Sequence, residues 1–127
     1  MNACSGDLLE RLAECYRRCD EDDDIRAVVV TGAGRAFCAG ADMSDAAKTF
    51  DVSGSGGFDD FSAAGCAVPA FRVRKLVVSA VNGHAIGLGM TLAMQCDIRI
   101  FAREGKYGIV QVRRGVMGDA YSHWTMV

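Results

Sequence analysis

The chain has 127 residues, of which 50% are hydrophobic and 24% charged, as expected for one globular domain with a single core. A formal net charge of -2, with 14 Lys and Arg residues scattered along the chain, argues against an electrostatic nucleic-acid binder. No apolar run approaches the roughly 20 residues of a membrane span, and the N-terminus lacks a signal pattern. We therefore expect a cytoplasmic protein with neither nucleic acid nor membrane as a partner.

The first predicted elements are a helix and a strand. Asp7 and Glu10 have the spacing of a capping box, which predicts a helix that runs to about Asp20. Residues 25–31 are largely β-branched, a pattern typical of a buried strand in a parallel sheet, and the glycines of residues 32–34 end it.

The middle of the chain changes in composition. Residues 48–60 are rich in Ser, Gly and Asp, which predicts a mobile surface loop. Residues 58–73 are expected to form a helix that is interrupted or bent near Pro69.

Alternating strands and helices follow. Strands are predicted over residues 76–81 and 97–102, with a short apolar helix over 87–95 between them. Residues 107–110 are expected to be extended, and a last helix to begin near residues 120–122. The order of the first six elements is α-β-α-β-α-β, which predicts an α/β fold.

Six cysteines are present, and no two of them have the C-x-x-C spacing of a zinc or redox site. Cys15 and Cys19 lie at helical spacing beside Leu8 and Leu12, and the other four lie in apolar or glycine-rich stretches. We interpret all six as reduced core residues and predict no metal site.

Two glycine-rich segments, residues 35–43 and 80–90, each follow a β-type run and are each expected to open a helix. The first amides of a helix lack intrahelical acceptors and carry partial positive charge, and glycine lets a carbonyl oxygen approach the main chain. Together the segments predict an anion site of two backbone N–H groups, the chemistry of an oxyanion hole. For each glycine taken singly, ordinary turn geometry is the alternative.

Four segments carry a resemblance to a known family: residues 25–32, 36–42, 81–89 and 96–99. In this order they resemble the crotonase superfamily, also called the enoyl-CoA hydratase/isomerase family. The resemblance implies an α/β fold of the ClpP/crotonase type, a spiral of β-β-α units. Residues 1–127 would be one partial core domain, truncated at both ends, without the opening strands and the C-terminal helices. The full-length protein would be a homotrimer or hexamer.

The resemblance also implies a site. The backbone N–H groups of Ala41 and Leu88 would bind the thioester carbonyl of an acyl-CoA and stabilise an enolate. Coenzyme A would be part of the substrate, and no separate cofactor is implied. Further substrate-binding residues are expected around these amides: Ala39, Gly40, Asp42, Met43, His84, Gly87, Thr91 and Gln111. Asp42 has a helix cap as its alternative role, and His84 a structural hydrogen bond.

The family's acid and base positions are altered in this sequence. Family hydratases use two glutamates, and the resemblance places Thr91 and Gln111 at their positions, where neither residue can be a carboxylate base. This favours an isomerase over a hydratase. Asp119 matches the catalytic aspartate of the dienoyl-CoA isomerase and 4-chlorobenzoyl-CoA dehalogenase branches, so it is the predicted proton-transfer residue, with the N-cap of the last helix as its alternative. The rival functions are a non-catalytic acyl-CoA-binding or scaffolding protein and an inactive fragment.

Overall fold

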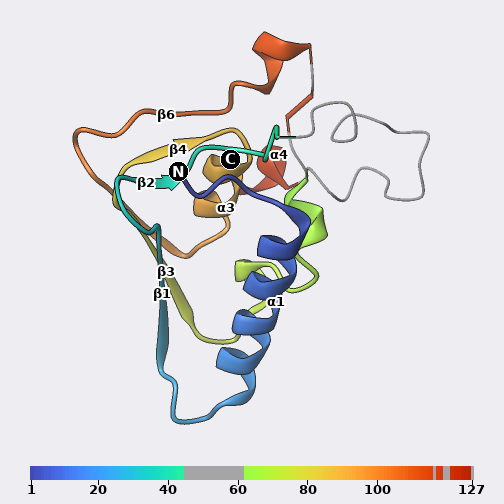
Figure 1. Cartoon of the computed structure of the whole chain (residues 1–127). Coiled ribbons are helices and arrows are strands. Elements are labelled where there is room, and N and C mark those ends of the chain that lie inside the picture. The colour runs from blue at the N-terminus through green and yellow to red at the C-terminus, as the bar shows by residue number, and fades with distance from the viewer. Residues whose placement is uncertain (45–61, 116, 119–120, 127) are drawn as a thin grey trace.

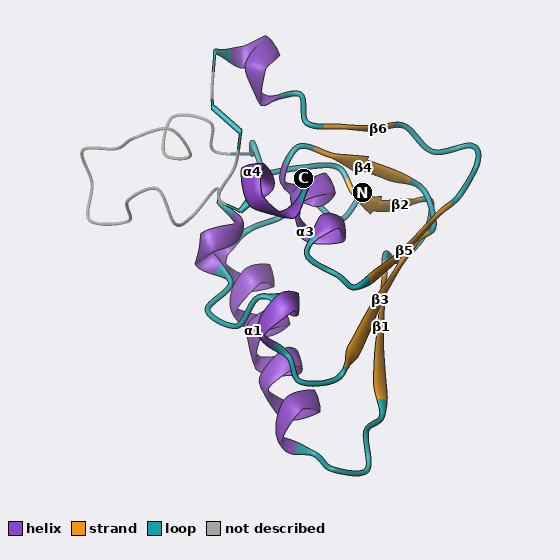
Figure 2. Cartoon of the chain, turned by 180° about the vertical axis from the view of Figure 1, so that it is seen from behind, coloured by secondary structure: helices purple, strands orange, loops and turns teal. Residues whose placement is uncertain are grey.

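The chain alternates between two parallel sheets. The computed structural model describes residues 1–44, 62–115, 117–118 and 121–126. Within them the first sheet has the strand order β1 (Ala27–Thr31), β3 (Leu76–Val81), β5 (Ile98–Phe101). The second has the order β2 (Ala36–Cys38), β4 (His84–Ile86), β6 (Tyr107–Gly108). Each strand of the first sheet is followed by one of the second, so the backbone advances as a spiral, and the sheets run in clearly different directions (Figure 2).

Helix α1 (Gly6–Glu21) precedes the first sheet and packs along it (Figure 1). Its N-cap residue is Ser5, whose Oγ accepts a hydrogen bond from the Leu8 N–H at 3.3 Å. The predicted capping box at Asp7 is therefore wrong, because a serine two residues earlier already provides the cap. The predicted end of the helix is confirmed within one residue.

The buried face of α1 agrees only in part with the predicted stripe, because Leu8 and Leu12 are partly buried against the core but Cys15 and Cys19 are not core residues. Its buried side chains are Leu9, Ala13 and Tyr16. Cys15 is exposed and Cys19 is partly exposed, so the prediction that they are core residues is wrong. Each residue turns a helix by about 100°, so a one-residue error in the stripe moves a side chain from the core to the surface. The other four cysteines are buried, as predicted.

In the part of the chain that the structure describes, the first sheet is covered on one face only. Helix α1 packs against the face that carries Val28 and Val30, whereas Val29, between them, is 66% exposed and Ile100 on β5 is 61% exposed. The strand predicted over residues 25–31 is present, but its predicted burial is wrong on the outer face. An apolar run therefore predicts the strand here without predicting that both of its faces are covered.

Between β2 and β3 in the chain, two 3-10 helices replace the predicted bent α-helix. They are Ala63–Gly65 and Ala70–Arg72, and Pro69 is the N-cap of the second, with ψ at 155°. Proline lacks the N–H that would continue a helix through this point. Residues 58–61 and the loop predicted over residues 48–60 lie outside the described residues.

The second half of the chain follows the prediction more closely. Strand β3 has the predicted bounds, and helix α3 (Leu88–Met94) and strand β5 lie within their predicted ranges. Only the first two residues of the extended segment predicted over 107–110 are a strand, and a 3-10 helix, Gln111–Arg114, follows.

The last helix, α4, spans Ser122–Thr125. Its N-cap residue is Tyr121, which makes no side-chain cap hydrogen bond, and Asp119, whose alternative role was this cap, lies outside the described residues. In the described part of the chain, no helix is long and apolar enough to cross a membrane.

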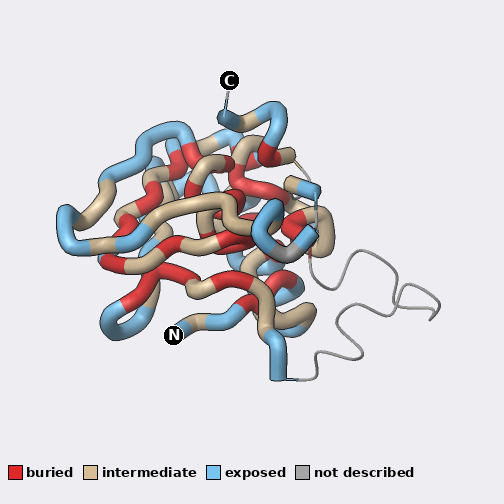
Figure 3. The backbone as a smooth tube through the Cα atoms, turned by 90° about the horizontal axis from the view of Figure 1, so that it is seen from above, coloured by how far each residue is buried: buried red, intermediate tan, exposed pale blue. Residues whose placement is uncertain are grey.

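The core lies between α1, the inner face of the first sheet and α3. Figure 3 shows that buried backbone segments gather inside the molecule, while turns and the ends of helices are exposed. Buried residues of α3 pack against this core and against the second sheet, and the two glycine-rich segments follow strands of that sheet.

Candidate functional site

The two glycine-rich segments leave neighbouring strands at one edge of the second sheet. Strand β2 pairs in parallel with β4, with Ala36 beside His84 and Cys38 beside Ala85. Because both strands run in the same direction, the segments at their ends emerge side by side. They are called here the first loop, residues 38–43, and the second loop, residues 86–89, and include the adjoining strand and helix residues. The second loop opens α3, as predicted, whereas a helix opened by the first loop would begin after Ser44, outside the described residues.

Two glycines bring the loops into close contact. A Cβ atom on Gly89 would lie 2.2 Å from the carbonyl oxygen of Cys38, far inside van der Waals contact. A Cβ atom on Gly40 would lie 3.2 Å from the carbonyl oxygen of Ile86, and Gly40 has a φ of +109°. Any side chain at Gly89 would push the loops apart, so packing explains this glycine without reference to a ligand.

The N-terminal segment pairs with the first loop on either side of Ala41. Cys4 donates its N–H to the carbonyl of Gly40 at 2.7 Å and accepts the N–H of Asp42 at 2.8 Å. Since alternate residues of an extended segment direct their backbone groups to opposite edges, the N–H of Ala41 is directed away from Cys4.

The two loops carry the amides that the sequence predicts as donors, Ala41 on the first and Leu88 on the second. Leu88 is the first residue of α3, so its N–H has no acceptor within the helix. Neither this N–H nor that of Ala41 has a hydrogen-bond acceptor among the residues that the structure describes. The two loops therefore present two backbone donors at the edge where they meet.

Gln111 lies against the second loop. Its side-chain amide atoms would be 3.7–3.8 Å from a Cβ atom on Gly87, and Gly87 donates its N–H to the carbonyl of Gly108 at 2.8 Å. The Oε1 atom of Gln111 is buried and has no hydrogen-bond partner within the described part of the chain. The structure therefore brings a neutral, unsatisfied acceptor to a loop that the resemblance assigns to the substrate.

Thr91 is fully buried in the first turn of α3. Its Oγ1 donates a hydrogen bond of 3.4 Å to the carbonyl of Gly87, the residue that caps the helix. This hydroxyl supports the backbone of the second loop, and it supplies no carboxylate.

The remaining residues of the first loop make local contacts. Ala39 donates its N–H to the carbonyl of Met1 at 3.1 Å, and Met43 is 44% exposed. The Asp42 carboxylate accepts the N–H of Ser44 at 2.9 Å, and this hydrogen bond lowers the pKa of Asp42. The bond has the form of an Asx turn.

His84 has a structural hydrogen bond, which was the alternative to a binding role. Its Nδ1 accepts the N–H of Lys106 at 3.0 Å and so ties β4 to the segment before β6. Asp119, the predicted proton-transfer residue, lies outside the described residues, and its role stays a prediction.

Two asparagines that support the loops escaped the sequence interpretation. Asn82 donates from Nδ2 to the carbonyl of Gly34 at 2.7 Å and accepts the N–H of Gly32 at Oδ1 at 3.0 Å. Asn2 donates from Nδ2 to the carbonyls of Ala36 at 2.8 Å and Phe37 at 3.1 Å. The Asn-Gly pair at residues 82–83 is a recognisable turn signal, whereas nothing in the sequence marks Asn2.

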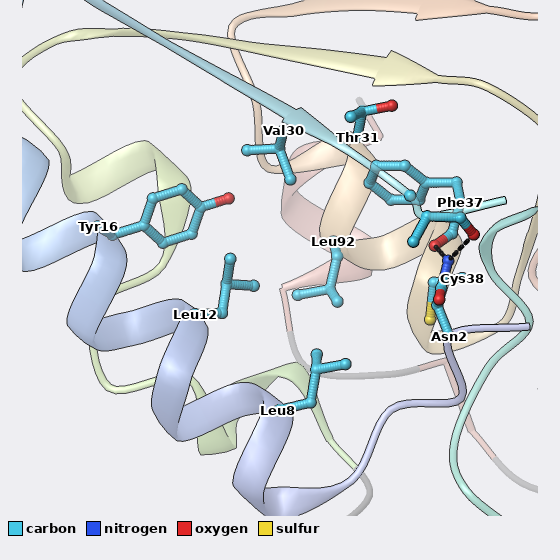
Figure 4. Close-up of a pocket in the computed structure, with 11 residues that line it drawn as sticks. Asn2, Leu8, Leu12, Tyr16, Val30, Thr31, Phe37, Cys38 and Leu92 are labelled. Carbon is cyan, nitrogen blue, oxygen red and sulfur yellow. Dashed lines mark hydrogen bonds between the residues drawn. The ribbon is translucent and has the colours of Figure 1, made fainter.

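A separate, mostly apolar cavity of about 240 Å³ lies between α1 and the first sheet (Figure 4). Leu8, Leu12 and Tyr16 point from α1 toward Val30, Phe37 and Leu92. Its lining includes Cys38 but neither Ala41 nor Leu88, so this cavity is distinct from the amide pair. Among the described residues, no group of three or more His, Cys, Asp or Glu side chains could hold a metal ion.

Known proteins share both the sequence and the fold of this chain. The 1,2-epoxyphenylacetyl-CoA isomerase of Escherichia coli is 36% identical over 135 residues, and the match covers 99% of this chain and 49% of that protein. The enoyl-CoA hydratase ACTT3 of Alternaria alternata is 32% identical over 125 residues, covering 95% of this chain and 40% of that protein. The chain thus spans half or less of the length of these relatives.

A crystal structure of a probable enoyl-CoA hydratase/isomerase from Mycobacterium abscessus superimposes with a TM-score of 0.84 at 49% identity. The superposition covers 98% of this chain and 46% of the chain from Mycobacterium abscessus. The predicted crotonase-like fold is therefore confirmed for a partial chain. The sequence model described as enoyl-CoA hydratase/isomerase matches residues 1–127. The chain therefore belongs to the enoyl-CoA hydratase/isomerase family, the crotonase superfamily.

Proposed function

We propose that the protein acts on acyl-CoA thioesters, and that the N–H groups of Ala41 and Leu88 hold the thioester carbonyl oxygen. The observation that carries this proposal is the pair of amides without acceptors in the described residues, on two loops in contact. Two donors aimed at one oxygen stabilise the negative charge that develops there when a proton leaves the α-carbon. The membership of the family supports the thioester as the group that is bound.

Proton transfer in this protein would depend on Asp119. Thr91 is a buried hydroxyl bonded to the backbone, and the Gln111 amide does not titrate, so neither supplies a carboxylate base. We therefore propose isomerisation, with Asp119 moving the proton, ahead of hydration. The relatives' names include both an isomerase and a hydratase, and so favour neither reaction by themselves.

Replacement of Leu88 tests the oxyanion role. Leu88→Pro removes the N–H at the first position of a helix, where proline is well tolerated. Leu88→Ala is the matched control, because it removes the buried side chain and keeps the N–H. We expect Leu88→Pro to lower acyl-CoA turnover about 10²- to 10³-fold relative to Leu88→Ala, with thermal melts of both variants as a check of folding. Equal turnover in the two variants would contradict the proposal.

A panel of thioesters separates catalysis from binding alone. The chain is offered 2-enoyl-, dienoyl- and aryl-CoA, and binding of a saturated acyl-CoA is measured by calorimetry. The isomerase is supported if the wild type turns over one of these thioesters and Asp119→Asn loses the turnover while it binds the saturated acyl-CoA with the same affinity. Binding without turnover of any thioester favours the non-catalytic acyl-CoA-binding protein, and a chain that neither melts cooperatively nor binds is an inactive fragment. The trimer or hexamer and the cytoplasmic location stay predictions.

A further inference from the structure

Cys4 and Cys38 form a pair of buried thiols beside the first amide loop. They are 1% and 4% exposed, and the thiol of Cys38 donates to the carbonyl oxygen of Gly40 at 3.8 Å, the same oxygen that accepts the N–H of Cys4. The backbone fixes this arrangement, because Cys4 pairs with Gly40 and Asp42 through two hydrogen bonds of 2.7 and 2.8 Å, and Gly40 is the residue that the Cys38 thiol contacts. The two cysteines are therefore neighbours around Gly40 as a consequence of the fold, although they lie far apart in the sequence.

The surroundings of Cys38 favour its thiolate. The hydrogen bond from Cys4 lowers the pKa of Cys38, although burial acts in the opposite direction. Thiolates, and not thiols, react with oxidants. Cys66 and Cys96 differ in this respect, because burial raises the pKa of each of them.

The apolar cavity gives a small oxidant access to Cys38. Cys38 is one of the residues that line it, and Figure 4 shows its sulfur beside Asn2. A volume of about 240 Å³ is ample for a molecule close to water in size, such as hydrogen peroxide. The buried pair is thus within reach of peroxide.

We propose that Cys4 and Cys38 are a redox modification site, which hydrogen peroxide converts to a disulfide beside the Ala41 amide. The Cys38 thiolate attacks peroxide, the O–O bond breaks, and one water leaves as the sulfenic acid forms. The Cys4 sulfur then attacks the Cys38 sulfur, the S–O bond breaks, and the second water leaves. In total two thiols lose two electrons and two protons, and one peroxide becomes two waters.

The disulfide would move the first loop. A hydrogen-bonded pair of sulfurs must approach to about 2.05 Å to form the bond. Cys38 also packs its carbonyl oxygen against Gly89 of the second loop, so a displacement of Cys38 alters the spacing of the two amides. We expect oxidation to weaken acyl-CoA binding. This last step rests on the proposed function, whereas formation of the disulfide does not.

Peptide mapping tests the disulfide directly. The folded chain is treated with an equimolar amount of peroxide, remaining thiols are blocked with iodoacetamide, and the protein is digested with trypsin. Each of the six cysteines falls in a different tryptic peptide, with Cys4 in residues 1–11 and Cys38 in residues 36–48. We expect these two peptides to be recovered as one disulfide-linked species, which a reducing agent separates.

Three controls define the outcome. Cys4→Ser leaves Cys38 as a sulfenic acid that dimedone labels, and Cys15→Ser, at an exposed position, leaves the linked species unchanged. In guanidinium chloride the preference for the Cys4–Cys38 pair disappears, because it depends on the fold. Oxidation confined to Cys15 and Cys19, or linkage of Cys4 and Cys38 no more frequent folded than unfolded, would overturn the proposal.

A binding measurement then separates the two proposals. Calorimetry with a saturated acyl-CoA compares the reduced, oxidised and re-reduced chain. Loss of affinity on oxidation that reduction reverses, and that Cys4→Ser does not show, supports the effect on the site. A linked pair without any acyl-CoA binding in the reduced chain contradicts the proposed function and leaves the redox site standing.

Discussion

The hydroxyl of Tyr16 and the thiol of Cys96 form a hydrogen bond in the core, where α1 meets the end of α3. Both residues are almost completely buried, at 3% and 2% exposure. Burial raises the pKa of Tyr16, and it raises that of Cys96 to about 11 from an ordinary value of 9.0. Two acids that stay protonated in the folded chain therefore lie side by side beneath the first sheet.

The Cys96 thiol predicts a loss of stability in alkali. Its pKa is higher in the folded chain than in the unfolded one, so the unfolded chain releases this proton first as pH rises. The stabilisation is complete below pH 9 and is lost between about pH 9 and 11, at about 1.4 kcal/mol per pH unit for one such group. Urea denaturation at pH 8 and pH 10.5 measures the difference.

Cys96→Ala is the control for alkaline unfolding. It lowers the free energy of unfolding at pH 8 because packing is lost, but it makes that free energy less dependent on pH. Buried Tyr16 still contributes at the upper end of the range, so the dependence decreases without vanishing. An unchanged slope in Cys96→Ala would exclude Cys96 as its source.

A second pH dependence is predicted from the contact between α1 and the segment that precedes β3. Asp20 accepts the backbone N–H of Arg74 at 2.6 Å and the Nε of Arg74 at 3.3 Å, and the backbone hydrogen bond above all lowers the pKa of Asp20. The stabilisation from a lowered carboxyl pKa is present above the unfolded value of 3.8 and is lost as pH falls through the folded value. We expect Asp20→Asn to lose less stability than the wild type between pH 5 and pH 2, measured by urea denaturation. Glu21→Gln, which removes the same charge one residue along, should follow the wild-type curve.

Elements with one dominant local signal could be predicted from the sequence. The bounds of β3 and of α3 follow from a β-branched run and from glycines that frame an apolar segment. The start of α1 could not, because Ser5 and Asp7 are both good caps and the choice depends on the fold. The exposure of Val29 could not be predicted either, since an apolar run does not show whether a second layer covers the strand.

The candidate site was predictable to the extent that it is backbone. The glycines of the two loops mark where the main chain must come close, and the loops do meet. Side-chain contacts between residues far apart in the sequence were not predictable. Asn2 donates a hydrogen bond to Ala36, 34 positions away, and the side chain of Gln111, which follows β6, lies against Gly87, which follows β4. No local pattern encodes such contacts, because each depends on the whole spiral being formed.

Asn82 is predicted to hold together the turns that follow β1 and β3. Asn82→Ala removes the hydrogen bonds to the carbonyl of Gly34 and from the N–H of Gly32. At about 0.5–1.5 kcal/mol for each bond, we expect the free energy of unfolding to fall by about 1–3 kcal/mol. Hydrogen exchange gives an internal control, because the Gly32 amide should exchange faster while the Val77 amide, bonded to Asp97 at 2.8 Å, keeps its protection. Unchanged exchange at Gly32 would contradict this role.

The contact between Gly89 and Cys38 predicts a position where a single methyl group separates the loops. Gly89→Ala places a Cβ atom 2.2 Å from the Cys38 carbonyl oxygen, and both partners are backbone, so neither can rotate away. Overpacking of this kind costs about 1–3 kcal/mol or more, and we expect a lower melting temperature together with loss of acyl-CoA binding. Gly108→Ala is the matched control, because its new Cβ atom would meet only the Cγ1 of Val110, at an ordinary 3.6 Å. If both variants lose the same stability, the effect comes from replacing glycine in general. A loss confined to Gly89→Ala shows that the close approach of the two loops depends on the absence of a side chain there.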